Sequence, residues 1–442
     1  MTDWSSSFTN SCQGSLSKVH PTVIVSKPVC RQAHQHHMWL WQRYCGQGAA
    51  KLTKDTTLAM LAGVICTFPP RGGVGSITVR VEDLMQLQPD EMLNDTCIEF
   101  FLKHRFAWGP LFDGTLLEPT SRYIESRLSA DVQQRFHIFS PFFFTKLLEK
   151  HSGLAGCTLI AEEDHNLVKR WTKNVDLFSK DYIVVPINGQ QHWSLVIICH
   201  PGSIATWIQE NLLPAVGAQQ ACGVLQDATC VKPLMLHLNS MEGTHDSQAI
   251  FAVLRGYLAL EWQCKMTDEG LDSVPRSCKE RLAAADINMP DFGLYWSEVP
   301  GTSMAERIPS QNNTVDCGLF LLCYVDFFMS ANPRCVLSKG SSAPDVRALD
   351  PRPEAADAST FMCKTWFLPS NASLLRDYMR VRIMMLMSDT LPPEDKRREV
   401  LGFLVEEYNK KPEEIGQRYL HPVEYLENLR KAAAHAAVLD AS

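Results

Sequence analysis

One cysteine, Cys317, stands where a polar, turn-forming segment (311–316) runs into a strongly apolar stretch (319–328). This pattern predicts a buried helix that begins near Cys317. The unpaired N–H groups and the dipole at a helix start favour thiolate over thiol, which suits a nucleophile. Gly318 after it lets another backbone or a substrate come close. Many cysteines that begin an apolar run are buried packing residues, so Cys317 needs chemical partners elsewhere in the chain.

The clearest strand signal in the chain leads to a histidine, His192. Two runs rich in β-branched residues, 181–187 and 192–199, flank the dipeptide Asn188-Gly189 and predict a hairpin with its turn there. His192 would then lie at the mouth of the second strand, where a side chain can face a cleft. A lone histidine at a strand edge is more often a packing or surface residue.

Two further polar groups complete a possible constellation. Asn239 directly follows a short predicted strand at 233–238, and Gln311 lies on the loop that approaches Cys317. A cysteine protease needs a thiolate, an imidazole that moves protons, a group that fixes the imidazole tautomer, and a donor for the oxyanion. Each residue alone is weak evidence, but their joint order along the chain favours this chemistry.

Several other elements must surround this site. A strand is predicted at 77–81, and a helix after Asn94 or Asp95 would bury one face, with either residue as its N-cap. A helix near 141–150 should bury its aromatic and leucine side chains, namely Phe142, Phe143, Phe144, Leu147 and Leu148. An amphipathic helix is expected at 247–262, and another apolar helix around Ile383.

The composition excludes several classes of protein. A net charge of −7 over 442 residues argues against a nucleic-acid-binding protein. The 15 cysteines are scattered singly, without zinc-knuckle spacing, so neither a disulfide framework nor a metal site is expected. His34, His36 and His37 are interpreted as a solvated cluster. We predict no cofactor, no signal peptide and no membrane anchor, and therefore an intracellular protein that is nuclear or cytoplasmic.

Residues from about 77 to 387 resemble the SUMO-specific cysteine proteases, the ubiquitin-like protease (Ulp/sentrin-protease) family. The segments that carry the resemblance are Leu93–Thr96 with Ile98–Phe101, Val175–Leu195, Leu236–Ser240, Gln311 with Asp316–Gly318, and Phe367–Pro369 with Ala372–Leu374. They occur in the family's order and cover roughly two-thirds of the chain.

The resemblance implies an α+β, papain-like fold with a central mixed sheet flanked by helices. It also implies hydrolysis after the C-terminal Gly-Gly of SUMO, in conjugates or in the precursor, by a monomer. Cys317 would be the nucleophile, His192 the general base and acid, Asn239 the third triad residue and Gln311 an oxyanion donor. Trp193 would lie over the diglycine tail, in a channel where a larger side chain would clash.

The sequence departs from the family pattern at two positions. Asn239 stands where the family generally has Asp; a neutral amide still orients the imidazole but does not stabilise the imidazolium by charge, so we expect a slower enzyme. Met92 replaces an aromatic residue, often Trp, before Leu93. Methionine is flexible, so Met92 should leave the substrate channel less rigid.

We expect three regions: a variable N-terminal extension (1–74), a protease domain (75–390) with insertions at about 201–229 and 332–360, and a charged, helix-prone tail (391–442). Two other functions stay open. One is a pseudoprotease that binds a ubiquitin-like modifier without cutting it, which Asn239 favours. The other keeps the fold but acts on Nedd8 or ubiquitin, or transfers acetyl groups as distant relatives do.

Overall fold

The computed structural model describes residues 64–69, 75–107, 130–157, 159–203, 233–267, 297–299, 307–335, 349–350, 361–395 and 397–440. The chain divides into two compact units, 1–47 and 48–442, and every described residue belongs to the second. The histidine cluster at His34, His36 and His37, the expected insertion from residue 204 onward and most of the one at 332–360 lie outside the described residues.

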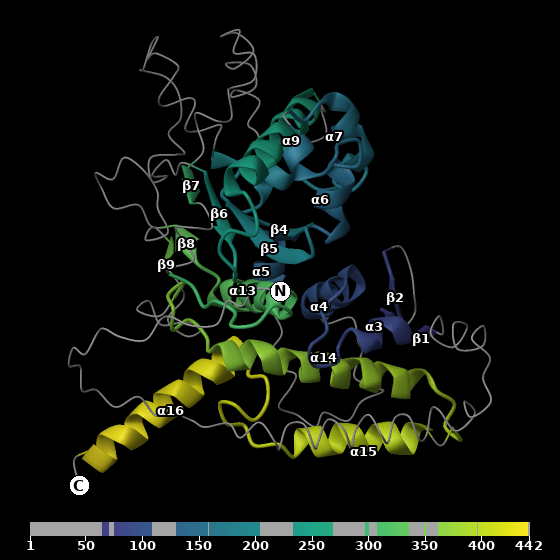
Figure 1. The fold of residues 1–442 in the computed structure, drawn as a ribbon, viewed down its shortest axis with the longest axis vertical. Helices are drawn as coiled ribbons and strands as arrows, with labels where there is room; N and C mark the ends of the chain where they lie inside the picture. Colours follow the sequence, from purple (N-terminus) through teal and green to yellow (C-terminus); the bar gives the residue numbers. More distant parts are fainter. Residues whose placement is uncertain are drawn as a thin grey trace, which may run out of the picture. The chain divides into compact units, whose positions relative to one another are not determined.

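A five-stranded mixed sheet forms the centre of the second unit (Figure 1). Its strands, in spatial order, are β3 (Phe136–Ile138), β4 (Tyr182–Gly189), β5 (His192–Cys199), β6 (Leu234–Leu238) and β7 (Ser297–Val299). Strands β4, β5 and β6 are antiparallel neighbours, whereas β3 and β7 pair in parallel with β4 and β6. The sheet and its helices make this an α+β fold, as expected.

Helices cover both faces of the sheet. One face carries α6 (Phe142–Leu147), α7 (Glu162–Val168) and α9 (Ser247–Thr267). The sheet side chains in the same core cluster as these helices are Ile183, Val185, Ile187, Val196, Ile198 and Met235. The other face carries α13 (Cys317–Ala331), which packs against β5. Alternate strand residues therefore serve two separate apolar layers, so the central strands read as nearly continuous hydrophobic runs.

The helix that begins with Cys317 is buried almost all round. Every residue of α13 except Ser330 is buried, which agrees with its uniformly apolar sequence. Asp316 is the N-cap residue, and Asn332 ends the helix in the left-handed conformation, with a φ of 42°. The helix predicted to begin near Cys317 is thus confirmed, with the cysteine as its first residue.

The β4–β5 hairpin is confirmed, but its turn is not where the sequence predicted it. Asn188 and Gly189 belong to β4, and Gly189 pairs with His192. The turn is made by Gln190 and Gln191, whose φ values of 53° and 58° are both positive. Such angles cost energy for a residue with a side chain. This cost is offset because the β4–β5 ladder gains two residues and the end of β4 forms hydrogen bonds with α4 and with the loop after β6.

Helix α4 (Asp95–Ala107) lies beside the start of α13. Asn94 is its N-cap residue, because its Oδ1 accepts a hydrogen bond from the N–H of Cys97 at 3.0 Å. The buried face expected on this helix is confirmed, since Cys97, Ile98, Phe101 and Leu102 are all buried. The N-cap and the buried face together fix where this helix begins and which side faces α13.

The described structure begins upstream of the expected domain start. Residues 64–68, part of the expected N-terminal extension, form β1 (Val64–Phe68), which pairs antiparallel with β2 (Ile77–Arg80). The predicted strand at 77–81 is confirmed, and α3 (Val81–Met85) follows it directly. The remaining short elements are α5 (Ala130–Arg135), two 3-10 turns (Leu154–Gly156 and Leu177–Ser179), β8 (Arg334–Cys335) and β9 (Leu349–Asp350).

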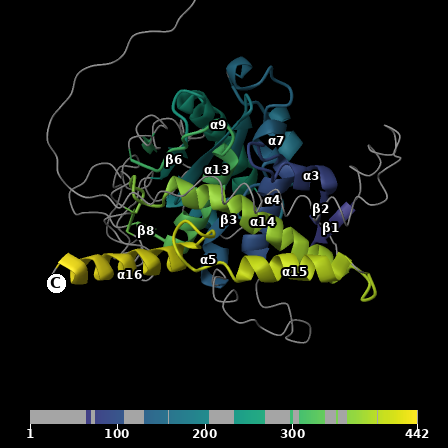
Figure 2. The same cartoon turned by 60° about the horizontal axis from the view of Figure 1, so that its bottom comes forward.

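In the described part of the chain, three helices follow α13. They are α14 (Pro369–Thr390), α15 (Arg397–Asn409) and α16 (Pro422–Asp440). Helix α14 packs against α13, β1 and α15, while α16 packs against α13. In Figures 1 and 2, α15 and α16 lie on the side of α14 away from the sheet. The tail also contributes a buried hydrogen bond of 2.7 Å from the hydroxyl of Tyr419 to Oδ2 of Asp326 in α13.

One burial expectation is wrong. Phe143, Phe144, Leu147 and Leu148 are buried, but Phe142 is 46% exposed. Successive residues of a helix point about 100° apart, so three consecutive phenylalanines cannot all face the sheet. Among the helices that the structure describes, none is both long and apolar enough to span a bilayer.

The tight contact at Gly318 yields a stability prediction. A Cβ at this position would stand 3.0 Å from Cβ of Leu93 and 3.1 Å from Cδ1 of Ile98. We expect Gly318→Ala to destabilise the fold by about 1–3 kcal/mol, because the core around it must shift. The control is Gly402→Ala on α15, where a Cβ meets nothing within 4 Å and alanine should stabilise the helix by about 0.5–1 kcal/mol. Urea denaturation measures both, and an unchanged Gly318→Ala midpoint would contradict this packing.

Candidate active site

Cys317 is held at the meeting point of α13 and the start of β5. The backbone N–H groups of Trp193 and Gly318 act on its sulfur in favour of the thiolate, and only 1% of the residue is exposed. Burial raises the pKa of the thiol above its usual value, and these N–H groups offset only part of the rise. The expectation that a helix start would favour the thiolate is therefore wrong for the free protein: desolvation outweighs the helix terminus, and the resting group is a thiol.

His192 and Asn239 are joined by a buried hydrogen bond. Nε2 of His192 lies 2.7 Å from Oδ1 of Asn239. The residues sit on adjacent strands, at the first position of β5 and directly after β6, where strand ends bring side chains together. Burial lowers the pKa of His192, and the bond to Asn239 raises it in part. The imidazole is therefore neutral at pH 7.

The orientation of the Asn239 amide follows from its own partners. Oδ1 accepts from the N–H of Met241 at 3.2 Å, and Nδ2 donates to Oγ1 of Thr244 at 3.1 Å. Thr244 in turn donates its hydroxyl proton to the carbonyl of Met241 at 2.7 Å. Since Oδ1 can only accept, His192 must carry its proton on Nε2. Nδ1 is then the basic nitrogen, and it has no hydrogen-bond partner among the residues that the structure describes.

Gln311 is oriented by Ser240, the residue after Asn239. The Ser240 hydroxyl donates to Oε1 of Gln311 at 2.6 Å, and the Gln311 N–H donates to the Ser240 carbonyl at 3.1 Å. Nε2 of Gln311 donates one proton to the carbonyl of Asn313 at 2.7 Å. Its second N–H has no partner within the described part of the chain, so it is available to a ligand. Asn239 and Ser240, which follow β6, thus orient the His192 imidazole and the Gln311 amide, respectively.

Trp193 links the site to the segment before α4. It is 3% exposed, and its indole N–H donates to the carbonyl of Leu93 at 2.9 Å. Leu93 also packs on Gly318, which explains why the residue after the cysteine has no side chain. Met92 precedes Leu93 and is half-buried. Trp193 and the 92–93 segment therefore form one wall beside Cys317.

A chain of hydrogen bonds lies behind His192 that sequence reasoning did not identify. His245 packs edge-to-face on His192, with ring centroids 4.9 Å apart. Its Nε2 donates to the carbonyl of Gly189 at 2.9 Å, so its Nδ1 accepts the Ser194 hydroxyl at 2.7 Å. Ser194 then accepts from Nε2 of His237 at 2.9 Å. This chain holds the turn-proximal end of β4 against β5 and β6.

His237 and His245, the two histidines of this hydrogen-bond chain, are neutral. Burial lowers the pKa of His237 to about 3, with further lowering from the nearby His245 and His192. Burial also lowers the pKa of His245. The three imidazoles therefore pack together without charge repulsion, and neither His237 nor His245 competes with His192 for a proton at neutral pH.

The predicted site residues lie in one region of the structure, and Met92 lies on the adjoining segment. They are His192, Trp193, Asn239, Gln311 and Cys317. The arrangement provides a thiol, a neutral imidazole with an open basic nitrogen, and an amide donor. This set can transfer a thiol proton and stabilise an oxyanion. Sequence reasoning missed Ser240, Thr244 and His245. The only signal for them was the run of polar residues that follows β6, because their roles depend on partners far away in the chain.

The amide orientation gives a test that does not depend on activity. Replacing Thr244 by Val removes the hydroxyl that holds Nδ2 of Asn239, so the amide can turn over and the His192 proton should redistribute between its two nitrogens. Selective ¹⁵N-histidine NMR should show a loss of the Nε2-protonated form in Thr244→Val and its retention in Thr244→Ser. If both variants kept the same tautomer as the unmodified protein, Thr244 would not set the orientation.

Comparison with known proteins now gives the family. The sequence matches the Ulp1 protease family, C-terminal catalytic domain, over residues 116–352. A probable ubiquitin-like-specific protease 2A of Arabidopsis thaliana is 32% identical over 307 residues, which make up 70% of this chain and 30% of that protein. Sentrin-specific protease 7 of Homo sapiens is 26% identical over 304 residues, 60% of this chain and 24% of that protein. The chain thus spans less than a third of the length of these relatives.

The chain is also similar to solved structures of proteases. A de-sumoylating protease is 18% identical, with a TM-score of 0.41, over 75% of this chain and 95% of that one. The catalytic domain of the Chaetomium thermophilum Ulp1-like SUMO protease is 14% identical, with a TM-score of 0.35, over 76% of this chain and 89% of that one. The family match alone covers more than half of the sequence. The chain belongs to the Ulp1 protease family.

Proposed function

We propose that the protein is a thiol protease that cleaves after the C-terminal Gly-Gly of SUMO, releasing it from target lysines or from its precursor. The observation that carries the proposal is the 2.7 Å bond between Nε2 of His192 and Oδ1 of Asn239, which leaves the basic Nδ1 open. In the proposed site this nitrogen would face the Cys317 thiol. Family membership supports the reaction class, and relatives named as ubiquitin-like-specific and sentrin-specific proteases support the substrate class.

In the proposed reaction, Nδ1 of His192 takes the thiol proton while the Cys317 sulfur attacks the carbonyl of the terminal glycine. The oxyanion accepts from the free N–H of Gln311 and from backbone N–H groups at the start of α13. His192 then gives its proton to the departing lysine amine, leaving a thioester. Water, deprotonated by His192, attacks the thioester and releases the glycine carboxylate and the thiol.

Neutral resting groups suit this sequence of steps. The raised pKa of Cys317 and the lowered pKa of His192 mean that the proton moves during the attack and not before it. Backbone N–H groups of Trp193 and Gly318 partly lower the pKa of the thiol, so they would stabilise the thiolate that forms in the attack. A neutral Asn239 fits this general-base route, because no charge on it must stabilise a permanent imidazolium.

Several other assignments belong to the same proposal. Trp193 and Met92 would line the channel for the diglycine tail, with SUMO or a related modifier and its conjugates as partners of a monomeric enzyme. The catalytic domain would span the described elements from β1 through α14, with α15 and α16 packed on it. We also propose an intracellular site of action, nuclear or cytoplasmic, because eight of the cysteines in the described part are free thiols.

A second candidate is a binding protein that recognises a ubiquitin-like modifier without cutting it. Two observations favour it: Asn239 lacks the usual charge, and burial both raises the pKa of Cys317 and leaves 1% of the residue exposed. The two candidates differ in whether the thiol reacts with a bound modifier tail.

A panel of ubiquitin-like modifiers that carry an electrophile at the C-terminal glycine separates these candidates. We expect an adduct with a SUMO probe at Cys317, located by peptide mass spectrometry, and none with Cys317→Ser. An adduct with the ubiquitin or Nedd8 probe alone would refute the SUMO assignment. No adduct with any probe, together with measurable binding of a modifier, would favour the binding protein. An adduct at another cysteine would refute Cys317 as the nucleophile.

Because Asn239 is neutral where the family generally has Asp, a carboxylate at this position should increase the activity. In Asn239→Asp the carboxylate should raise the pKa of His192 and stabilise the imidazolium, so kcat/KM on a SUMO substrate should rise by about tenfold on its plateau. The acid limb of the pH profile should move to higher pH, because the imidazole must lose its proton to act as a base. The control is Asn239→Ala, which removes both charge and orientation and should lower the rate. An Asp variant with no gain at any pH would contradict this account.

A further inference from the structure

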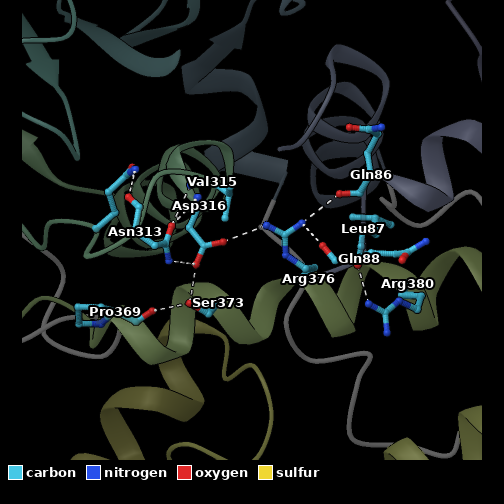
Figure 3. Close-up of polar contacts among 11 residues, drawn as sticks. Gln86, Leu87, Gln88, Asn313, Val315, Asp316, Pro369, Ser373, Arg376 and Arg380 are labelled. Atoms are coloured by element: carbon cyan, nitrogen blue, oxygen red, sulfur yellow. Dashed lines mark hydrogen bonds and ion pairs between the residues drawn. The ribbon is translucent and has the colours of Figure 1, made fainter. Parts of the chain in front are cut away.

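Asp316, directly before Cys317, is a buried carboxylate with donors on several sides (Figure 3). Its Oδ1 accepts from Nη2 of Arg376 at 2.9 Å. Its Oδ2 accepts from Nδ2 of Asn313 at 2.9 Å and from the hydroxyl of Ser373 at 2.7 Å. Arg376 and Ser373 both belong to α14, so this helix supplies the counter-charge to the residue that begins the nucleophile helix.

Arg376 also holds a second segment. Its Nη1 donates to the backbone carbonyls of Gln86 and Gln88 at 3.0 and 2.9 Å. The residue is 5% exposed, so its guanidinium charge is held away from water by these partners. The forked, planar guanidinium can make these bonds at once, which an ammonium group cannot.

The two segments bound by Arg376 are the two sides of the site. The 86–88 segment continues to Met92 and Leu93, and the carbonyl of Leu93 accepts the hydrogen bond from the Trp193 indole. Asp316 leads to the thiol. One buried side chain, from a helix outside the 116–352 region that matches the family, therefore links both walls around Cys317.

Asp316 has opposite effects on the helix and on the thiol. A carboxylate at the N-cap interacts favourably with the helix dipole. The same charge opposes a thiolate one residue later and contributes to the raised pKa of Cys317. Asp316 is the charged group that acts on this thiol, and it is paired with Arg376 from α14, while α4 places the apolar Ile98 next to Gly318. Arg376 is the cation paired with Asp316 within the described residues.

We infer that Arg376 is a positioning residue for the proposed reaction. It fixes the loop of Cys317 against the segment that leads to Met92 and Leu93, and it neutralises Asp316 so that a thiolate can form beside it. The inference rests on the proposed role of Cys317 as the nucleophile, but its electrostatic part concerns the thiol alone and is measurable without any substrate.

The first test measures how fast iodoacetamide alkylates Cys317 as a function of pH in the full chain, read at the Cys317 peptide by tandem mass spectrometry. In Arg376→Gln the unpaired Asp316 should disfavour the thiolate, so alkylation at pH 7.5 should fall by about tenfold, equivalent to about one unit in the thiol pKa. The rates should converge above the thiol pKa. The double variant Asp316→Asn/Arg376→Gln should recover the rate at pH 7.5.

Arg380→Gln is the matched control. Arg380 lies one turn further along α14, is also buried, and donates to the carbonyl of Leu87 between the two carbonyls that Arg376 holds. It pairs with Asp377 and not with Asp316. A purely structural effect of losing an arginine from this helix should appear in both variants. We expect the alkylation profile of Arg380→Gln to match that of the unmodified protein.

If Arg376→Gln does not fold, as judged by circular dichroism, Asp316→Asn alone tests the same charge. Arg376 would then be an uncompensated cation near the thiol, and alkylation at pH 7.5 should become several-fold faster. An alkylation profile of Arg376→Gln equal to that of Arg380→Gln, or an unchanged profile in Asp316→Asn, would overturn the inference.

A second experiment separates the positioning role of Arg376 from its charge. Arg376→Lys keeps the positive charge but cannot bridge Asp316 and both carbonyls, so alkylation should stay within about twofold while reaction with the SUMO probe slows. Equal probe rates in Arg376→Lys and the unmodified protein would refute the positioning role. If the unmodified protein forms no adduct with any modifier probe, the proposed function fails, and a shifted alkylation profile in Arg376→Gln would still stand as a separate result.

Discussion

The buried hydrogen bond between His192 and Asn239 is the contact on which the rest of the site depends. It requires the first residue of one strand to face the residue that ends the next, so the register of β4, β5 and β6 must be correct over their whole length. It also requires the amide to present its oxygen, which Met241 and Thr244 ensure. A one-residue slip in any strand would turn these side chains to the opposite face. The continuous apolar runs of the central strands resist such a slip by filling cores on both faces.

The site is assembled from neutral groups in a dry environment. Burial keeps Cys317 as a thiol and His192 as an imidazole, and it lowers the pKa of the neighbouring His237 and His245. Asp316 brings a charge next to the thiol, and Arg376 balances it. A low-charge site of this kind avoids the desolvation cost of a permanent ion pair, and it makes proton transfer part of the attack itself. The absent carboxylate at position 239 is consistent with this arrangement.

The elements that hold the site come from distant parts of the chain. The segment before α4, the β4–β5 hairpin, the end of β6, the loop before α13 and the middle of α14 each contribute one or two contacts around Cys317. Each contact is a directional hydrogen bond to a backbone group or a buried polar atom. Such bonds are strong where water is excluded, and an unsatisfied partner there is costly. Rigidity at the thiol therefore arises from several long-range ties and not from any single element.

The sequence by itself predicted four of the strands, β2, β4, β5 and β6, the helix that begins at Cys317 and the residues gathered at the site, because alternating and continuous apolar patterns and polar residues at element ends are local signals. Family motifs suggested the proposed roles of Cys317 and His192. The tertiary structure decided what local pattern cannot: the turn at Gln190 and Gln191, the exposure of Phe142, and the direction of the Cys317 pKa. Each of these depends on how neighbouring elements pack. The Arg376–Asp316 pair joins residues 60 positions apart, and no spacing in the sequence relates them before the chain folds.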